Sequence, residues 1–171
     1  MADSDQLLQR NKDLEATFAH EEAGIIARHP VYVITCLDPR TDPSAFLDLD
    51  LCDAMVVRNA GSRVSADVLK DLAYIGYLAS ALVPGGAQFE AAVVHHTRCG
   101  TRFLADKFRR GFADLIGADD AALSREAVTS PEQTVHSDVE LLRSATVPPI
   151  TISISGHVYE VITGLVNQES E

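Results

Sequence analysis

Three runs of apolar and β-branched residues constrain the fold of this chain more than any other feature. They span residues 31–36 (VYVITC), 54–58 (AMVVR) and 89–96 (FEAAVVHH). A strand with one solvated face alternates apolar and polar residues, whereas these runs carry consecutive apolar residues. They therefore predict strands that are buried on both faces, as in a parallel sheet covered by helices.

The segment between the second and third runs has the pattern of a helix. Ser65 can cap its N-terminus, and a strand, a helix and a further strand in this order form a crossover unit with parallel strands. The apolar face of this helix comprises Val68, Leu69, Leu72, Ile75 and Leu82. The sequence thus predicts an α/β fold with a mostly parallel central sheet flanked by helices, in a single domain over residues 1–171.

Helices are also expected before and after these strands. A narrow apolar stripe of Leu7, Leu14 and Phe18 predicts a helix over about residues 4–22. A second helix is expected over 101–116, and its inward side should comprise Phe103, Leu104, Phe108, Phe112 and Leu115.

The last third of the chain is expected to alternate between helix and strand. A loop with a short helix is expected over 117–129, and a helix should run from the Ser130-Pro131 cap to about residue 145. Strands are predicted over 150–155 and 158–161, with a turn at Gly156-His157 between them.

Charge and hydropathy exclude several classes of function. The chain has 25 Asp and Glu against 14 Lys and Arg, a net charge of −11, and no basic run, which argues against nucleic acid and anionic membrane surfaces as partners. The uncharged stretch 72–88 contains Pro84, Gly85 and Gly86 and is shorter than the ~20 apolar residues of a membrane span. The acidic N-terminus does not resemble a signal peptide, so we expect a cytoplasmic protein whose three cysteines are free thiols.

Two cysteines and a histidine are expected to meet at one edge of the sheet. Cys36 ends the first strand and His96 ends the third. Cys99 follows at the expected start of a helix, and the partial positive charge of a helix N-terminus favours the thiolate form of this cysteine. The carboxyl ends of parallel strands share an edge, where ligands of open α/β sheets gather. Two thiolates and one imidazole are a zinc ligand set, and a catalytic site keeps its fourth position open.

The other cysteine and histidines carry plainer interpretations. Each cysteine taken alone fits a buried core thiol, and Cys52 keeps that interpretation. His95 should be structural, because its side chain points away from that of His96 on a strand. The remaining histidines, which have no paired spacing, are expected at the surface or at caps: His20, His29, His136 and His157.

The motifs CLDPR at 36–40, RNAG at 58–61 and HHTRCG at 95–100 together resemble the β-class carbonic anhydrases. The similarity is greatest to the short microbial and fungal branch, which includes carbonyl sulfide hydrolases. It implies that Cys36, His96 and Cys99 bind Zn²⁺ and that Asp38 and Arg40 form a catalytic dyad beside the metal. Arg98, where many relatives carry Asp, and the Ser62-Arg63 pair depart from the family pattern.

The resemblance implies hydration of carbon dioxide to bicarbonate by zinc-bound hydroxide. The alternative is hydrolysis of carbonyl sulfide or carbon disulfide by the same hydroxide. Asp38 would be a fourth zinc ligand only in a closed state, and Arg40 would release it by pairing with it. Ala60 and Gly61 could line a narrow apolar pocket, although Gly61 could equally serve only the turn.

Two other hypotheses keep the same residues. In one, the zinc site is structural and Asp38 closes it permanently. In the other, Cys36 and Cys99 form a redox switch without metal.

The family resemblance also bears on assembly. It implies that the N-terminal helix docks on a partner subunit, in a homodimer or homotetramer; packing of that helix within its own chain is the alternative. The substrate would be a small neutral gas, which needs no steering by surface charge.

Overall fold

The computed structural model describes residues 3–14, 24–83, 88–145 and 152–170. A five-stranded sheet has the order β2-β1-β3-β4-β5. The strands are β1 (Val31–Cys36), β2 (Met55–Asn59), β3 (Phe89–His96), β4 (Ile152–Glu160) and β5 (Leu165–Ser170). The first four pair in parallel and β5 is antiparallel to β4, so the sheet is mostly parallel as predicted.

Six α-helices and two 3-10 helices accompany the sheet in the described residues. The α-helices are α1 (Asp3–Leu14), α2 (Pro43–Phe46), α3 (Ala66–Leu82), α4 (Lys107–Ile116), α5 (Asp120–Glu126) and α6 (Pro131–Ser144). The 3-10 helices are η1 (Ala60–Ser62) and η2 (Gly100–Ala105). None of the helices within these described ranges has both the length and the apolar character that a membrane span requires.

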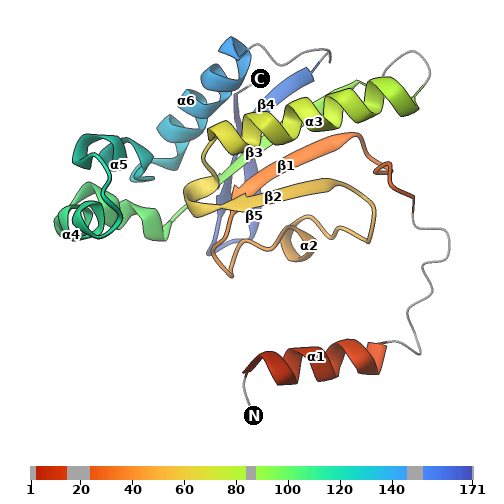
Figure 1. The fold of residues 1–171 in the computed structure, drawn as a ribbon, viewed down its shortest axis with the longest axis horizontal. Coiled ribbons are helices and arrows are strands. Elements are labelled where there is room, and N and C mark those ends of the chain that lie inside the picture. The colour runs from red at the N-terminus through yellow and green to blue at the C-terminus, as the bar shows by residue number, and fades with distance from the viewer. Residues whose placement is uncertain (1–2, 15–23, 84–87, 146–151, 171) are drawn as a thin grey trace.

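The main core lies between the sheet and the two helices α3 and α6 (Figure 1). Val68 and Leu72 of α3 and Val135 and Val139 of α6 pack on the apolar residues of β1 and β3. The side chain of Ser65 accepts a hydrogen bond from the backbone of Val68, which caps α3 as the sequence predicted. These helices bury one face of β1 and β3. The absence of alternation in both strands also requires cover on their other face.

A smaller cluster covers the other face of the sheet. Val33, Val94 and Tyr159 are buried there, and the ring of Phe46 from α2 stacks on that of Tyr159 with centroids 4.6 Å apart. Figure 1 shows α1 set apart from the sheet and its helices. Leu7 and Leu14 of α1 are exposed, while Phe18 and the rest of the predicted helix lie outside the described residues.

The predicted helix over 101–116 is divided at Asp106. The side chain of Asp106 accepts a hydrogen bond from the backbone of Phe108 and starts α4 in a new direction after η2. The inward orientation that we predicted for the apolar stripe is wrong, because Phe108, Phe112 and Leu115 are 52, 39 and 80% exposed. A helical period shows that a helix has an apolar face, but not which surface covers that face.

The predicted turn at Gly156-His157 is also wrong. Strand β4 continues through these residues with a shift in its register against β5. Gly156 instead permits close packing, because a Cβ atom there would lie 2.9 Å from Cγ2 of Val139 on α6. Strand β5 was not predicted, because its sequence LVNQES has little apolar character and its side chains are mostly exposed.

Candidate metal centre

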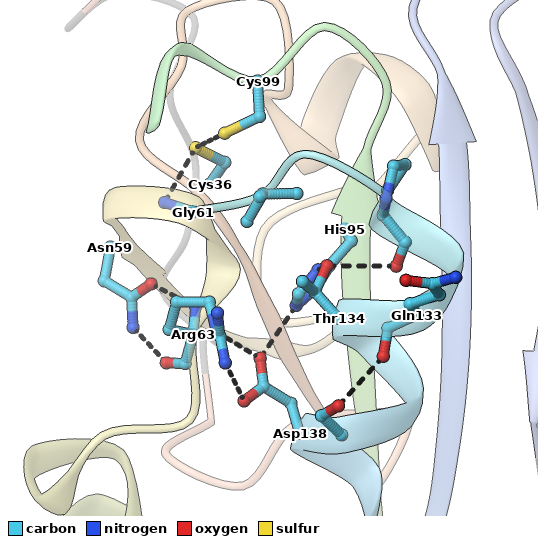
Figure 2. A network of polar contacts seen from close by, with 12 residues as sticks. Cys36, Asn59, Gly61, Arg63, His95, Cys99, Gln133, Thr134 and Asp138 are labelled. Carbon is cyan, nitrogen blue, oxygen red and sulfur yellow. Dashed lines mark hydrogen bonds and ion pairs between the residues drawn. The ribbon is translucent and has the colours of Figure 1, made fainter. Parts of the chain in front are cut away.

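Cys36, His96 and Cys99 converge at the carboxyl ends of β1 and β3, which are neighbours in the sheet. All three side chains are buried, and their ligand atoms lie within 4.8 Å of one another. The two sulfurs are 4.0 Å apart and face each other in Figure 2. Two sulfurs on one tetrahedral zinc ion, each about 2.3 Å from the metal, are separated by about 3.8 Å. The spacing of the sulfurs therefore fits a metal ion.

The imidazole of His96 is held in the tautomer that a metal ligand needs. Its Nδ1 lies 3.0 Å from the carbonyl oxygen of Thr97, and because a carbonyl only accepts, Nδ1 carries the proton. Nε2 is buried and has no hydrogen-bond partner among the described residues. A buried nitrogen lone pair without a donor is costly unless something binds it. These residues could thus hold a metal with two thiolates and one imidazole.

The surroundings of the two sulfurs favour the thiolate form at Cys36 and the thiol form at Cys99, where the sequence predicted a thiolate. The backbone N–H of Gly61 donates to Sγ of Cys36 at 3.4 Å, and Oγ1 of Thr101 lies 3.1 Å from Sγ of Cys99. The hydrogen bond between the two thiols lowers the pKa of Cys36 to about 4 and raises that of Cys99, which burial raises further. Since metal ligands must lose their protons, a metal ion has to displace the proton that this pair shares.

Asp38 and Arg40 form a bidentate ion pair beside these ligands. Nε of Arg40 donates to Oδ1 of Asp38 at 2.8 Å, and its second terminal nitrogen donates to Oδ2 at 2.6 Å. The same nitrogen of Arg40 also donates to the carbonyl oxygen of Arg98 at 3.1 Å. The hydrogen bonds from Arg40 hold the pKa of Asp38 well below its usual range. Asp38 is thus an ionised carboxylate, and it is not among the ligand atoms that converge.

Arg58 of β2 fixes the turn that carries this pair. Its guanidinium donates to the carbonyl oxygens of Cys36 at 2.9 Å and Asp38 at 2.8 Å. The sequence indicated Arg58 only as part of a motif. Arg58 is 22 residues away from Cys36 along the chain, so the sequence did not indicate that the two are in contact. The contact arises because β1 pairs with β2.

Ala60 and Gly61 occupy different environments. Gly61 is buried with φ +81°, and a Cβ atom there would lie 3.1 Å from Oγ1 of Thr101 and 3.2 Å from Cγ2 of Val128. Glycine is therefore required by its backbone conformation and by the close approach of the chain behind Cys99. Ala60 is exposed and lines an open, mostly apolar groove of about 620 Å³ together with residues of η2 and α4.

Comparison with known proteins identifies the family. A sequence model of the family described as "Carbonic anhydrase" matches residues 31–166, which include every residue of the centre described above. The chain belongs to the β-carbonic anhydrase family.

Several known proteins resemble this chain over most of its length. "Beta-carbonic anhydrase 1" of Mycobacterium tuberculosis is 29% identical, with 98% of each chain covered. The "Carbon disulfide hydrolase" of Acidianus sp. is 27% identical over 89% of this chain and 83% of that protein. The crystal structure of carbonic anhydrase from Streptococcus mutans has a TM-score of 0.81 and 28% identity, with 99% of both chains covered.

Ser62 and Arg98, two of the residues that the resemblance marked as departures, have left-handed backbones. Ser62 has φ +59°, is fully buried, and its hydroxyl has no partner among the described residues. Arg98 has φ +58° and an exposed side chain. Its carbonyl, rather than its guanidinium, contacts the dyad through Arg40.

Asp138 is a buried charged residue near the centre that was not predicted from the sequence. Asp138 of α6 binds both Arg63 and His95, and its side chain is only 2% exposed. His95 points away from His96, as expected, and burial lowers its pKa. A signal was present, because Asp138 shares the buried stripe of α6 with Val135, Val139 and Leu142. An aspartate within an apolar stripe indicates a buried partner.

The remaining cysteine and histidines lie away from the centre. Cys52 is a free thiol, but it is only partly buried, unlike the buried core thiol that the sequence predicted. His29 and His136 are exposed, and His20 lies outside the described residues. His157 differs from the expectation, since it is half-buried within β4 and its Nε2 lies 2.8 Å from Oγ of Ser155.

Proposed function

We propose that this protein binds one zinc ion through Cys36, His96 and Cys99 and hydrates carbon dioxide to bicarbonate. The observation that carries the proposal is the unpartnered Nε2 of His96, which lies buried beside two sulfurs 4.0 Å apart. Three protein ligands and an open fourth position are typical of catalytic rather than structural zinc sites. When bound, zinc supplies the Lewis acidity that makes a water molecule nucleophilic near neutral pH.

Asp38 orients that water in the proposed mechanism. Arg40 holds Asp38 ionised, so its carboxylate can accept a hydrogen bond from the water and turn a lone pair toward the substrate carbon. One water oxygen bonds to carbon dioxide, and one proton passes to buffer, which gives bicarbonate. We also propose that Asp38 binds the metal only when Arg40 releases it, which would close the site.

The groove beside the centre suits a small neutral substrate. Its lining from Ala60, Leu104, Phe108 and Phe112 is largely apolar, and an apolar wall does not bind a charged molecule strongly. The product is an anion, which such a lining would release. Both properties are consistent with a gas that enters and bicarbonate that leaves.

A second candidate reaction is the hydrolysis of carbon disulfide or carbonyl sulfide. It is favoured by the 27% identity to a carbon disulfide hydrolase and by the same apolar groove, since these molecules are neutral and linear like carbon dioxide. Attack at carbon would be the same. One water would convert carbonyl sulfide to carbon dioxide and one hydrogen sulfide, and two waters would convert carbon disulfide to carbon dioxide and two hydrogen sulfides.

A side-by-side assay of protein with measured zinc content distinguishes the candidates. Carbon dioxide hydration is followed by stopped-flow pH indicator, and sulfide release is followed from carbonyl sulfide and from carbon disulfide. We expect rapid hydration with little sulfide release. Sulfide release without hydration would assign the protein to the second reaction, and neither activity in zinc-loaded protein would contradict both.

We further propose that the active form is a homo-oligomer, a dimer or a tetramer. The exposed leucines of α1 and the exposed apolar stripe of α4 support this, because large apolar surfaces on a folded chain mark interfaces. The proposal has α1 dock on a partner subunit rather than on its own sheet.

A further inference from the structure

A network of ion pairs and hydrogen bonds lies next to the metal centre, below the two sulfurs in Figure 2. Arg63 donates two hydrogen bonds to Asp138, from Nε to Oδ2 at 2.7 Å and from a terminal nitrogen to Oδ1 at 3.1 Å. Nε2 of His95 lies 3.0 Å from the same Oδ2. The Asp138 carboxylate on α6 therefore links Arg63, which follows η1, to His95, which precedes His96.

The cost of burying these charges calls for a role. Asp138 and His95 are almost fully buried, and removing charged groups from water is expensive even when they are paired. An apolar residue at the position of Asp138 would match Val135, Val139 and Leu142 on the same face of α6. Arg63, His95 and Asp138 are not among the converging metal ligands, and none of them is part of the Asp38–Arg40 pair.

Through Arg63, the network fixes the backbone N–H of Gly61 that donates to Sγ of Cys36. Arg63 and Asn59 are joined by reciprocal hydrogen bonds: the Arg63 N–H donates to Oδ1 of Asn59 at 2.8 Å, and Nδ2 of Asn59 donates to the Arg63 carbonyl at 2.7 Å. These bonds close the turn that presents the N–H of Gly61 to Sγ of Cys36. Since Asp138 clamps the Arg63 side chain, it fixes the orientation of this turn.

Through His95, the network fixes the end of β3. An Asp carboxylate only accepts, so Nε2 of His95 donates to Asp138, and Nδ1 lies 2.8 Å from Oγ1 of Thr134. The ring of His95 is thus held at both nitrogens by α6. His96 is the next residue, and a rotation of the strand end that freed one ring would displace the other.

We propose that Asp138 is a positioning residue that holds the Gly61 turn through Arg63 and the His96 strand end through His95, so that Cys36, His96 and Cys99 bind their metal tightly. This inference rests on the metal centre proposed above. Partners behind metal ligands usually act on ligand orientation and on the charge of the ligand atom, and their loss weakens metal binding about ten- to a hundredfold.

The test measures metal binding rather than turnover. Asp138→Asn keeps the size of the side chain but offers Arg63 only one acceptor oxygen. Arg63→Lys keeps the charge opposite Asp138 but removes the two parallel hydrogen bonds. The matched control is Glu140→Gln, which breaks an exposed ion pair with Arg143 on the same helix. Zinc affinity is measured by chelator competition, and the cobalt-loaded protein is examined by absorption spectroscopy.

We expect Asp138→Asn to weaken zinc binding about ten- to a hundredfold and Arg63→Lys to weaken it less, with Glu140→Gln unchanged. The thiolate-to-cobalt band should move to longer wavelength in both network variants, because a thiolate that loses an N–H donor gives up its electrons more readily. Zinc affinity and a cobalt spectrum equal to those of the parent, in variants that merely unfold at lower temperature, would overturn the proposal.

If Asp138→Asn does not fold, Arg63→Lys decides by the same criteria, because it leaves Asp138 paired with a cation. If the parent binds zinc but does not hydrate carbon dioxide, the proposed function fails. The comparison of metal affinities between parent and variants still decides the role of Asp138.

Discussion

Asp38 and Arg40 are joined by two side-chain hydrogen bonds and by a third from the backbone N–H of Arg40 to Oδ1 of Asp38 at 3.0 Å. The two residues flank Pro39, which fixes its own φ and restricts Asp38 to extended backbone. A plain surface ion pair is worth at most about 1 kcal/mol. This pair differs from an ordinary surface ion pair in its position beside the metal ligands. Asp38 lies two residues after Cys36, and Arg40 also donates to the carbonyl oxygen of Arg98.

Substitution of Asp38 distinguishes a catalytic zinc site from a structural one. For Asp38→Ala we expect retained zinc and a kcat/KM lower by about two to four orders of magnitude, since a positioned acceptor is lost. Asp120→Ala, which breaks the exposed pair with Arg109, is the control and should leave both unchanged. Loss of zinc and of stability in Asp38→Ala would instead indicate that Asp38 is a permanent fourth ligand.

Ser62 carries two unfavourable features at once, a left-handed backbone and a buried hydroxyl without a described partner. Both costs disappear in Ser62→Gly, while added freedom of the unfolded chain opposes the gain. We expect a net rise of about 1 kcal/mol in the free energy of unfolding, measured by denaturant titration. Ser62→Ala removes only the hydroxyl and should gain less. A less stable Ser62→Gly protein would show that the hydroxyl has a use.

At the level of elements, the sequence predicted the parts of the fold that are fixed by local patterns. The continuous apolar runs of β1 and β3 and the Ser65 cap of α3 were sufficient to place Cys36 and His96 on neighbouring strand ends. The break at Asp106 and the bulge at Gly156 were not predictable in this way. The break depends on the Asp106 side-chain cap, which lies within a longer run of helical periodicity. The bulge depends on the contact of Gly156 with α6, which is distant in sequence.

The same distinction applies within the site. The ligand residues stand in motifs, so their spacing along the chain was informative. Arg63 and Asp138 are 75 residues apart, and their contact exists only because α6 packs on β3 behind η1. A single sequence does not show which residues of a helix will contact which residues of a sheet. The isolated aspartate in an apolar stripe was the one available sign of such a contact.

Strand β4 contains a pH-sensitive position. His157 has its pKa lowered by burial, with an opposing effect of Glu90, and its ring contacts Ser155. The folded state therefore takes up fewer protons than the unfolded state just below pH 6.5, so stability is present above that pH and is lost as pH falls. We expect His157→Gln to reduce the loss of unfolding free energy between pH 7.5 and 5.5. An unchanged pH dependence, equal to that of the exposed control His136→Gln, would contradict this.

At the scale of the whole molecule, the net charge of −11 contrasts with the apolar stripe of α4 beside the metal centre. The charge suits a protein that remains dispersed, and a neutral gas needs no electrostatic steering. The stripe borders the groove that Ala60 lines. An interface formed there would exclude water from the mouth of the site.

Light scattering tests the assembly. We expect the parent protein to have at least twice the mass of one chain, and Phe112→Glu combined with Leu115→Glu to lower the mass toward that of a single chain. Leu141→Glu, at an exposed apolar position on α6, is the control and should not change the mass. A monomeric parent protein would refute the proposed dimer.

The central claim is that Cys36, His96 and Cys99 hold a catalytic zinc ion that supports carbon dioxide hydration. Its most direct test is the stopped-flow hydration rate of one preparation before chelation, after zinc removal, and after zinc is restored to one ion per chain. We predict fast hydration, a fall to the uncatalysed rate, and recovery with zinc. A zinc-loaded protein that hydrates carbon dioxide no faster than buffer, or a rate unaffected by zinc removal, would contradict the claim.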